Sequence, residues 1–243
     1  MNEQFGVGSV LSTAFRVYFR NIIAFTLITA LLYIPVILFT TWFLSRSADS
    51  FDMASLAKFG LGMAALNMVL NSFVSATLTY GVVKELQGQR ASIGQCIVVG
   101  FKRMLPVFGV AIVSALALVG GFILLIIPGF IVLCMLYVAT PASVIEAPGV
   151  FGALRRSRDL TAGHKGSIFG LVFLLGLIGW GVNKIHEVAM PVTLANFKSY
   201  MYINTGIQIV LAALGACVAA VAYYALRAEK EGTSANELAA VFE

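Results

Sequence analysis

The sequence predicts an all-α membrane protein that crosses the bilayer six times. Three observations support this prediction: 60% of the 243 residues are hydrophobic, only 11% are charged, and the mean hydropathy is +0.94. Soluble domains carry roughly 25% charged residues, which places this chain in the integral membrane class. We expect a single membrane domain over residues 1–243, because the spans and short links use nearly the whole length.

Long intervals without charged residues locate the predicted spans. Crossing the hydrocarbon core takes about 20 apolar residues, and a charged side chain at its centre is costly. Four intervals fit one span each, whereas residues 104–145 form a 42-residue interval, about twice the length needed. Pro128 and Gly129 near its middle are typical of a turn, so we expect a tight hairpin there. The predicted spans are about 21–44, 59–83, 104–126, 129–146, 166–185 and 204–226.

A short amphipathic segment precedes every second predicted span. These segments cover residues 8–20, 91–103 and 149–162, and each places polar and apolar side chains on opposite faces at helical spacing. Such segments are typical of helices that lie in the membrane interface. We therefore expect an internal repeat: three copies of an interfacial helix followed by a helical hairpin.

The basic residues predict the orientation in the membrane. Cytoplasmic links are enriched in Lys and Arg, so the richer side is expected to be cytoplasmic, with both termini inside. We interpret the net charge of +5 as membrane-surface charge and expect no nucleic-acid partner. The richer side carries Arg16, Arg20, Lys84, Arg90, Lys102, Arg103, Arg155, Arg156, Arg158, Lys165, Arg227 and Lys230. The opposite side carries only Arg46, Lys58, Lys184 and Lys198.

The residue types that usually carry chemistry are scattered. Cys96, Cys134 and Cys217 stand singly, which favours packing residues over a disulfide framework or a metal site. His164 and His186 fall on opposite sides of the predicted membrane, so they cannot share a metal or an acid–base site. We expect no metal, no cofactor and no enzyme activity. The pattern leaves the oligomeric state open.

The densest charge lies in the link between the fourth and fifth predicted spans. Glu146 stands at its start, and arginines follow within ten residues. Three interpretations stay open: ordinary residues of the positive side, an ion pair that pins the interfacial helix to the span, or a site for an anionic lipid headgroup or a partner carboxylate. The candidate lipid- or partner-binding residues are Glu146, Arg155, Arg156, Arg158, His164 and Lys165.

A second candidate feature is a polar face inside the second predicted span. Asn67 and Asn71 are four residues apart and Ser75 continues the same helical face. Amides in hydrocarbon need partners, so an interhelical hydrogen bond is the favoured interpretation. The alternative is a polar path for a transported molecule.

Several short motifs resemble one family of bacterial membrane proteins. In order along the chain they are Tyr80-Gly-Val-Val-Lys-Glu-Leu-Gln-Gly88, Ile127-Pro-Gly, Glu146, Ser157-Arg-Asp-Leu-Thr-Ala-Gly163 and Ala222-Tyr-Tyr-Ala-Leu-Arg227. They resemble the family that includes the membrane domain of glycerophosphoryl diester phosphodiesterases and YciC-like inner-membrane proteins. The resemblance implies a six-helix bacterial inner-membrane protein. In that family the phosphodiesterase chemistry belongs to a separate soluble domain, so the resemblance implies no activity for this chain.

The leading functional hypothesis is a non-enzymatic inner-membrane protein that interacts with lipids or with another membrane protein. The three amphipathic segments motivate it, and anionic headgroups are the expected lipid ligands. The alternative hypothesis is a transporter of small molecules or lipids, which the repeats and the polar face at Asn67, Asn71 and Ser75 motivate.

Overall fold

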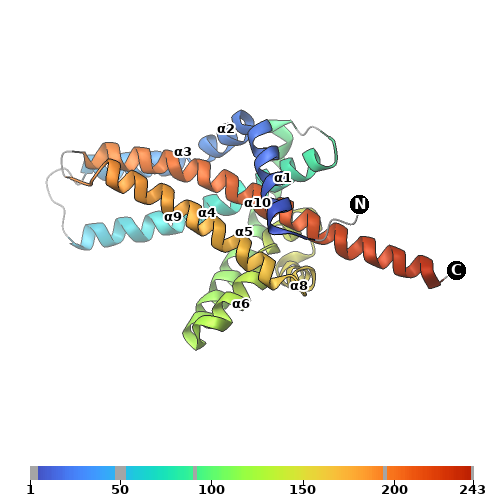
Figure 1. Ribbon diagram of the computed structural model, residues 1–243. Coiled ribbons are helices and arrows are strands. Elements are labelled where there is room, and N and C mark those ends of the chain that lie inside the picture. Colours follow the sequence, from blue (N-terminus) through green and yellow to red (C-terminus); the bar gives the residue numbers. More distant parts are fainter. Residues whose placement is uncertain (1–4, 47–52, 90–91, 194–195, 242–243) are drawn as a thin grey trace.

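The computed structural model describes residues 5–46, 53–89, 92–193 and 196–241, and this part of the chain forms helices and no strand (Figure 1). The predicted all-α class is confirmed. The helices are α1 (Val7–Arg20), α2 (Ile22–Leu32), α3 (Ile34–Arg46), α4 (Met53–Leu86), α5 (Ile93–Leu124), α6 (Ile126–Leu136), α7 (Ala139–Ile145), α8 (Gly149–Thr161), α9 (Lys165–Ala189) and α10 (Phe197–Val241).

Several of these helices are long and apolar enough to cross a membrane, and α6 and α7 together form one such segment. The described part contains five such segments, and a sixth if α1 and α2 are counted as one bent span. The protein is therefore an all-α polytopic membrane protein. The five segments are Ala57–Leu86, Ile93–Leu124, Ile126–Ile145, Lys165–Ala189 and Phe197–Gly232.

The region of the first predicted span, 21–44, contains two helices, α2 and α3, that meet at Tyr33. Pro35 accounts for the division, because it has no N–H to donate to the carbonyl of Leu31. The preceding helix, α1, covers Val7–Arg20 and meets α2 at an angle of 81° at Asn21. That angle suits a helix lying along the interface in front of one that enters the membrane.

In Figure 1 the helices diverge in two directions from the region around α1 and α8, which we call the junction. One arm contains α3, α4, α9 and α10, and the far half of the α5–α6 hairpin points in another direction. α1 and α8 lie at the junction, and the C-terminal part of α10 extends beyond it. Segments from both ends of the chain and from its middle are therefore brought together there.

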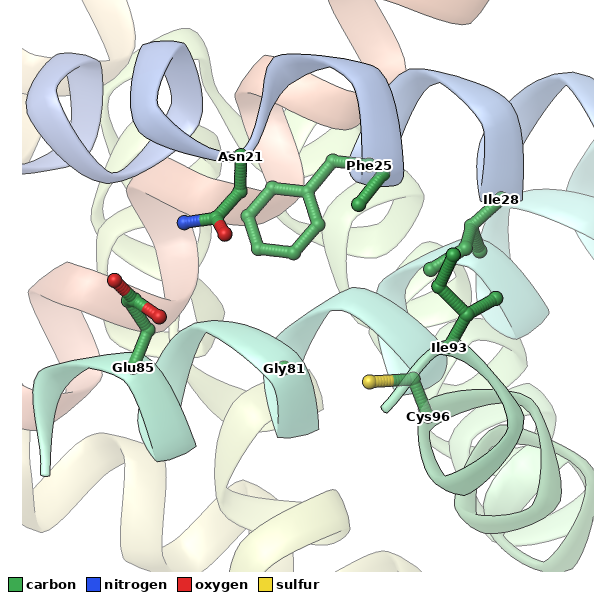
Figure 2. A pocket seen from close by; sticks show the side chains of 8 residues that line it. Asn21, Phe25, Ile28, Gly81, Glu85, Ile93 and Cys96 are labelled. Carbon is green, nitrogen blue, oxygen red and sulfur yellow. The ribbon is translucent and has the colours of Figure 1, made fainter. Parts of the chain in front are cut away.

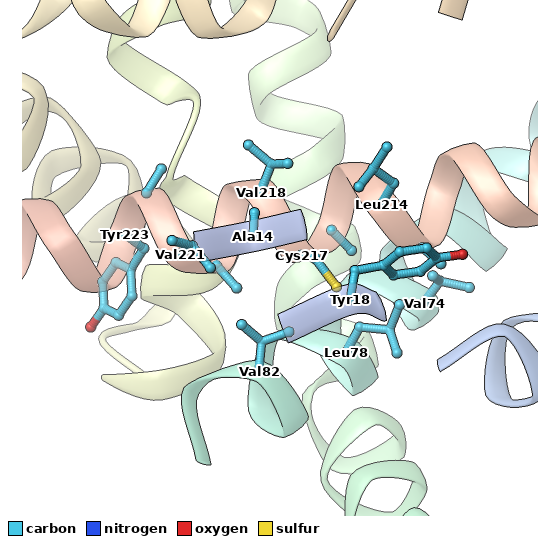
Figure 3. Close-up of a cluster of buried hydrophobic side chains, with 14 of the residues drawn as sticks. Ala14, Tyr18, Val74, Leu78, Val82, Leu214, Cys217, Val218, Val221 and Tyr223 are labelled. Atoms are coloured by element: carbon cyan, nitrogen blue, oxygen red, sulfur yellow. The ribbon is translucent and has the colours of Figure 1, made fainter. Parts of the chain in front are cut away.

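The hydrophobic core lies where α1 crosses α4 and α10 (Figure 3). Ala14 of α1, Leu78 of α4, and Cys217 and Val218 of α10 are completely buried. Small residues at the crossing let the helix backbones approach closely, which is how helices associate in an apolar solvent. The crossing fixes α1 and α10 to each other beside the junction.

The second amphipathic segment differs from the prediction. Residue 91 lies outside the described residues, and residues 93–103 are continuous with the predicted span 104–126 in the single helix α5. A capping box of Ser92 and Gln95 starts this helix. Gly100 lets α5 pack directly on α4, because a Cβ at this position would collide with Thr77. This packing holds the amphipathic segment in line with the span, so the second unit lacks the bend found between α1 and α2.

The hairpin turn also lies in a different place. Leu125, with φ −168° and ψ 157°, breaks the helix, and Pro128 falls in the first turn of α6, where its missing N–H costs nothing. Gly129 serves close packing instead of the turn. A Cβ on Gly121 of α5 would lie 3.1 Å from the Cα of Gly129.

Candidate functional site

Glu146, the residue that caps the C-terminus of α7, lies at the centre of a polar contact between three helices. The Nε of Arg156 in α8 donates to both of its carboxylate oxygens at 2.9 Å. The hydroxyl of Tyr223 in α10 donates to Oε1 at 2.7 Å. Of the three interpretations of Glu146, the contacts match the ion pair that pins the interfacial helix to the span.

Two further residues of α10 complete this ion-pair cluster, which consists of Glu146, Arg156, Tyr223, Arg227 and Glu231. The Nη2 of Arg156 donates to Glu231 Oε1 at 2.7 Å, and the Nε of Arg227 donates to both Glu231 oxygens at 2.9 Å. The Nε of Arg227 also lies 4.0 Å from Oε1 of Glu146. Two guanidinium groups therefore face two carboxylates, and the cluster is electrically balanced.

The guanidinium of Arg156 forms its ion pairs within the cluster. Burial lowers the pKa of Arg156, but the hydrogen bonds and negative charges of Glu146 and Glu231 together outweigh burial and raise the pKa above its ordinary value. The side chain is 27% exposed and that of Glu146 is 19% exposed. Arg156 is thus a positioning residue of the fold, and its guanidinium is already paired with two carboxylates.

The chain between α7 and α8 places Arg156 over Glu146. Ala147 and Gly149 both have positive φ, at 53° and 77°, and Pro148 lies between them. This turn is strained for an L-residue at Ala147, and it redirects the chain within three residues so that α8 packs against α7. α8 therefore returns towards the end of α7.

The Ser157-x-x-Leu-Thr-x-Gly stretch anchors the other side of α8. Ser157, Leu160 and Thr161 are completely buried, and Gly163 ends the helix region with φ 91°. The Ser157 hydroxyl donates to the carbonyl of Met135 at 2.7 Å. That carbonyl belongs to the last turn of α6 and has no partner inside α6, which stops before Tyr137. Pro141 contributes to this break, because it cannot donate to the carbonyl of Tyr137.

The opposite face of α8 is exposed. Phe151, Arg155 and Arg158 follow the spacing i, i+4, i+7 and are all exposed, with Phe151 exposed by 76%. Neither guanidinium group makes a hydrogen bond or an ion pair within the part of the chain that the structure describes, and the Thr161 hydroxyl bonds only the backbone carbonyl of Arg158. We call these three residues the cationic face of α8. Lys165, at the start of α9, is also exposed.

His164 belongs to a separate contact. Its Nε2 lies 3.4 Å from Glu229 Oε1 of α10, and its ring packs edge-on against Phe5 with centroids 5.4 Å apart. The backbone N–H of Phe5 donates to the other oxygen of Glu229 at 3.0 Å. His164 therefore helps to hold the N-terminal segment against α10, and the six predicted residues divide between the cluster, this contact and an exposed surface.

The polar face of α4 is largely occupied by local hydrogen bonds. The Asn67 amide donates to the Met63 carbonyl at 2.9 Å, and the Asn71 amide donates to the Asn67 carbonyl at 3.0 Å. Asn71 also accepts from the Tyr33 hydroxyl at 3.3 Å, which joins α4 to the α2–α3 junction. Ser75, one turn further along, is partly buried. The Asn71 contact is the kind of interhelical bond that the sequence favours.

Sequence reasoning missed three members of the ion-pair cluster. Tyr223, Arg227 and Glu231 are spaced four residues apart, which predicts that they share one face of α10. Nothing in the sequence links that face to Glu146, 77 residues away from Tyr223. The link depends on how α7, α8 and α10 pack.

Comparisons with known proteins give no relative for this chain. No protein-family model matches it, and neither a curated protein nor a solved structure is significantly similar. The resemblance to the phosphodiesterase membrane domain and YciC-like proteins therefore stays a prediction.

Proposed function

We propose that this protein is a non-enzymatic membrane protein of the bacterial inner membrane that binds anionic lipid headgroups through the cationic face of α8. The observation that carries the proposal is the division of the α8 arginines. Arg156 is paired with Glu146 and Glu231, whereas Arg155 and Arg158 are exposed on the face that also carries Phe151.

The composition of the cationic face suits a membrane interface. An aromatic ring is stable among the glycerol and upper acyl groups, and a planar guanidinium donates two hydrogen bonds to one phosphate group. Each basic residue near an anionic surface contributes about 1 kcal/mol. The ion-pair cluster supports this role, because it holds the buried side of α8 against α7 and α10.

Two other helices, α1 and α5, also carry an exposed aromatic ring near a basic residue. Both sites lie on the side of the spans that is rich in Lys and Arg. Phe19 is exposed at the end of α1 near Arg16, and Phe101 is exposed in the first turns of α5 beside Lys102. In the proposed orientation this end faces the cytoplasm, as the distribution of Lys and Arg predicts. The three sites together would surround the junction with anionic lipid.

The experiment compares lipid binding by native mass spectrometry of the protein in a neutral detergent with added phosphatidylglycerol. We expect the double variant Arg155→Gln, Arg158→Gln to bind about 30-fold more weakly, because it loses two contributions of about 1 kcal/mol each. The matched control, Lys58→Gln with Lys198→Gln, removes two exposed positive charges from the predicted opposite side and should leave the affinity unchanged.

Equal affinity in the two double variants would refute the proposal. Loss of binding in both would show that only net charge matters, and this would also contradict a site on α8. If lipid binding is unselective and cross-linking from position 155 captures a membrane protein instead, the cationic face serves a protein partner and the lipid proposal is wrong.

A further inference from the structure

A small cavity with a polar end lies between α2, α4 and α5, away from the cationic face of α8 (Figure 2). It is a cavity of about 90 Å³ whose lining includes Asn21, Phe25, Glu85 and Cys96. Figure 2 shows Asn21 and Glu85 on one side of the opening and the Cys96 thiol on the other, with the Phe25 ring between them. One end of the cavity is therefore polar and the other is apolar.

The polar end offers acceptors for a cation. The Glu85 side chain is only 12% exposed and its Oε1 lies 3.2 Å from the Nε of Arg20, which is itself 64% exposed. The Asn21 amide nitrogen donates to the carbonyl of Val17, so the amide turns its donor away. Within the described part of the chain its oxygen Oδ1 receives no hydrogen bond and stays available as an acceptor.

The cavity lies at the depth of lipid headgroups. Asn21 directly follows Arg20 at the start of one uncharged interval, and Glu85 follows Lys84 just past the end of another. Charged side chains at such boundaries mark the interface between hydrocarbon and water. The exposed Ile93 of α5 forms part of the rim, so the opening is accessible from the surface of the bundle.

We propose that this cavity binds the primary ammonium group of a zwitterionic phospholipid headgroup, with the lipid phosphate at Arg20. A carboxylate and an amide oxygen accept hydrogen bonds from an ammonium group, and the face of the Phe25 ring attracts its charge. The cavity volume of about 90 Å³ is well above the roughly 10 to 15 Å³ that one water molecule requires, so the cavity has room for an ammonium group and the carbon next to it.

The order of the charges around the cavity, from inside to outside, is complementary to the order of the charges along such a headgroup. Glu85 is shielded and Arg20 projects outward, so a negative group lies inside and a positive group outside. The headgroup has the reverse order, with its ammonium at the tip and its phosphate nearer the glycerol. This inference is independent of the cationic face on α8, since it uses other helices and a ligand group of opposite charge.

The test again uses native mass spectrometry of the full chain in neutral detergent, now with phosphatidylethanolamine. We expect Glu85→Gln to bind this lipid about tenfold more weakly, because the charged acceptor is lost. Ala24→Leu should have a similar effect, since Ala24 lines the cavity and a larger side chain fills it while the Arg20–Glu85 pair remains. Glu187→Gln, which removes an exposed carboxylate elsewhere, is the control and should bind like the unaltered protein.

Other ligands separate the alternatives. Phosphatidylcholine should bind at least about tenfold more weakly than phosphatidylethanolamine, because its trimethylated nitrogen has no N–H to donate to Glu85 or Asn21. Soluble ethanolamine should compete only in large excess; equally tight binding of the free amine would overturn the assignment to a lipid. Unchanged binding in Ala24→Leu would overturn the cavity as the site. Arg155→Gln with Arg158→Gln should retain phosphatidylethanolamine, so this proposal and the α8 proposal can fail separately.

Discussion

A double-mutant cycle on Glu146 and Arg156 measures how strongly the cluster holds α8 to the membrane bundle. Glu146→Gln keeps the side-chain length, Arg156→Gln shortens the side chain, and each single variant removes one charge. An exposed ion pair contributes about 0 to 1 kcal/mol, and breaking a buried one costs about 3 to 5 kcal/mol. The Glu146 and Arg156 side chains are 19% and 27% exposed, and their bond uses both carboxylate oxygens. We therefore expect a coupling free energy of about 2 kcal/mol.

The assay is reversible unfolding of the protein in mixed micelles by a denaturing detergent, with the free energy of unfolding measured for the four members of the cycle. Lys184 and Glu187 provide the control pair, because they form an ion pair three residues apart that is 51% and 56% exposed. Their coupling should be about 0.3 kcal/mol. A coupling for Glu146 and Arg156 as small as that of the control would refute the pinning role of the cluster.

Two further predictions concern the packing around the same junction. Ser157→Ala should lower the free energy of unfolding by about 2 kcal/mol, since the part-buried Met135 carbonyl loses its donor, and Ser9→Ala, at an exposed hydroxyl, should change it little; equal effects would contradict the role of Ser157. Gly100→Ala should lower the thermal unfolding midpoint because its Cβ collides with Thr77, whereas Gly94→Ala in the same helix meets no atom within 4 Å and should be neutral or slightly stabilising; a stabilised Gly100→Ala variant would contradict the close α4–α5 packing.

The all-α membrane class was predictable because hydrocarbon tolerates few charges, so uncharged intervals report helices directly. The same reasoning placed α8 and the charged link after Glu146. It could not place the break at Leu125 or the continuity of α5, because these depend on neighbours. Gly100 brings α5 onto α4, and the Gly121–Gly129 contact positions the hairpin. Local residue types such as Pro and Gly favour a turn but do not say which of two adjacent turns is used.

The candidate sites were predictable only in part for a related reason. The sequence offers an ion pair between Glu146 and a following arginine as one of three interpretations, but it does not choose between Arg155 and Arg156. The choice follows from helical phase once Ser157 and Leu160 are buried, because Arg156 then points to α10 and Arg155 to the surface. The cavity at Asn21 and Glu85 joins residues from three helices and has no signature in the sequence.

The most direct test of the central claim is a density map of the protein in lipid nanodiscs that contain phosphatidylglycerol. The proposed function predicts an ordered headgroup whose phosphate lies within hydrogen-bond distance of Arg155 and Arg158, with Arg156 still bonded to Glu146. A map that shows α8 covered by ordered lipid elsewhere but no phosphate at these two arginines would contradict it.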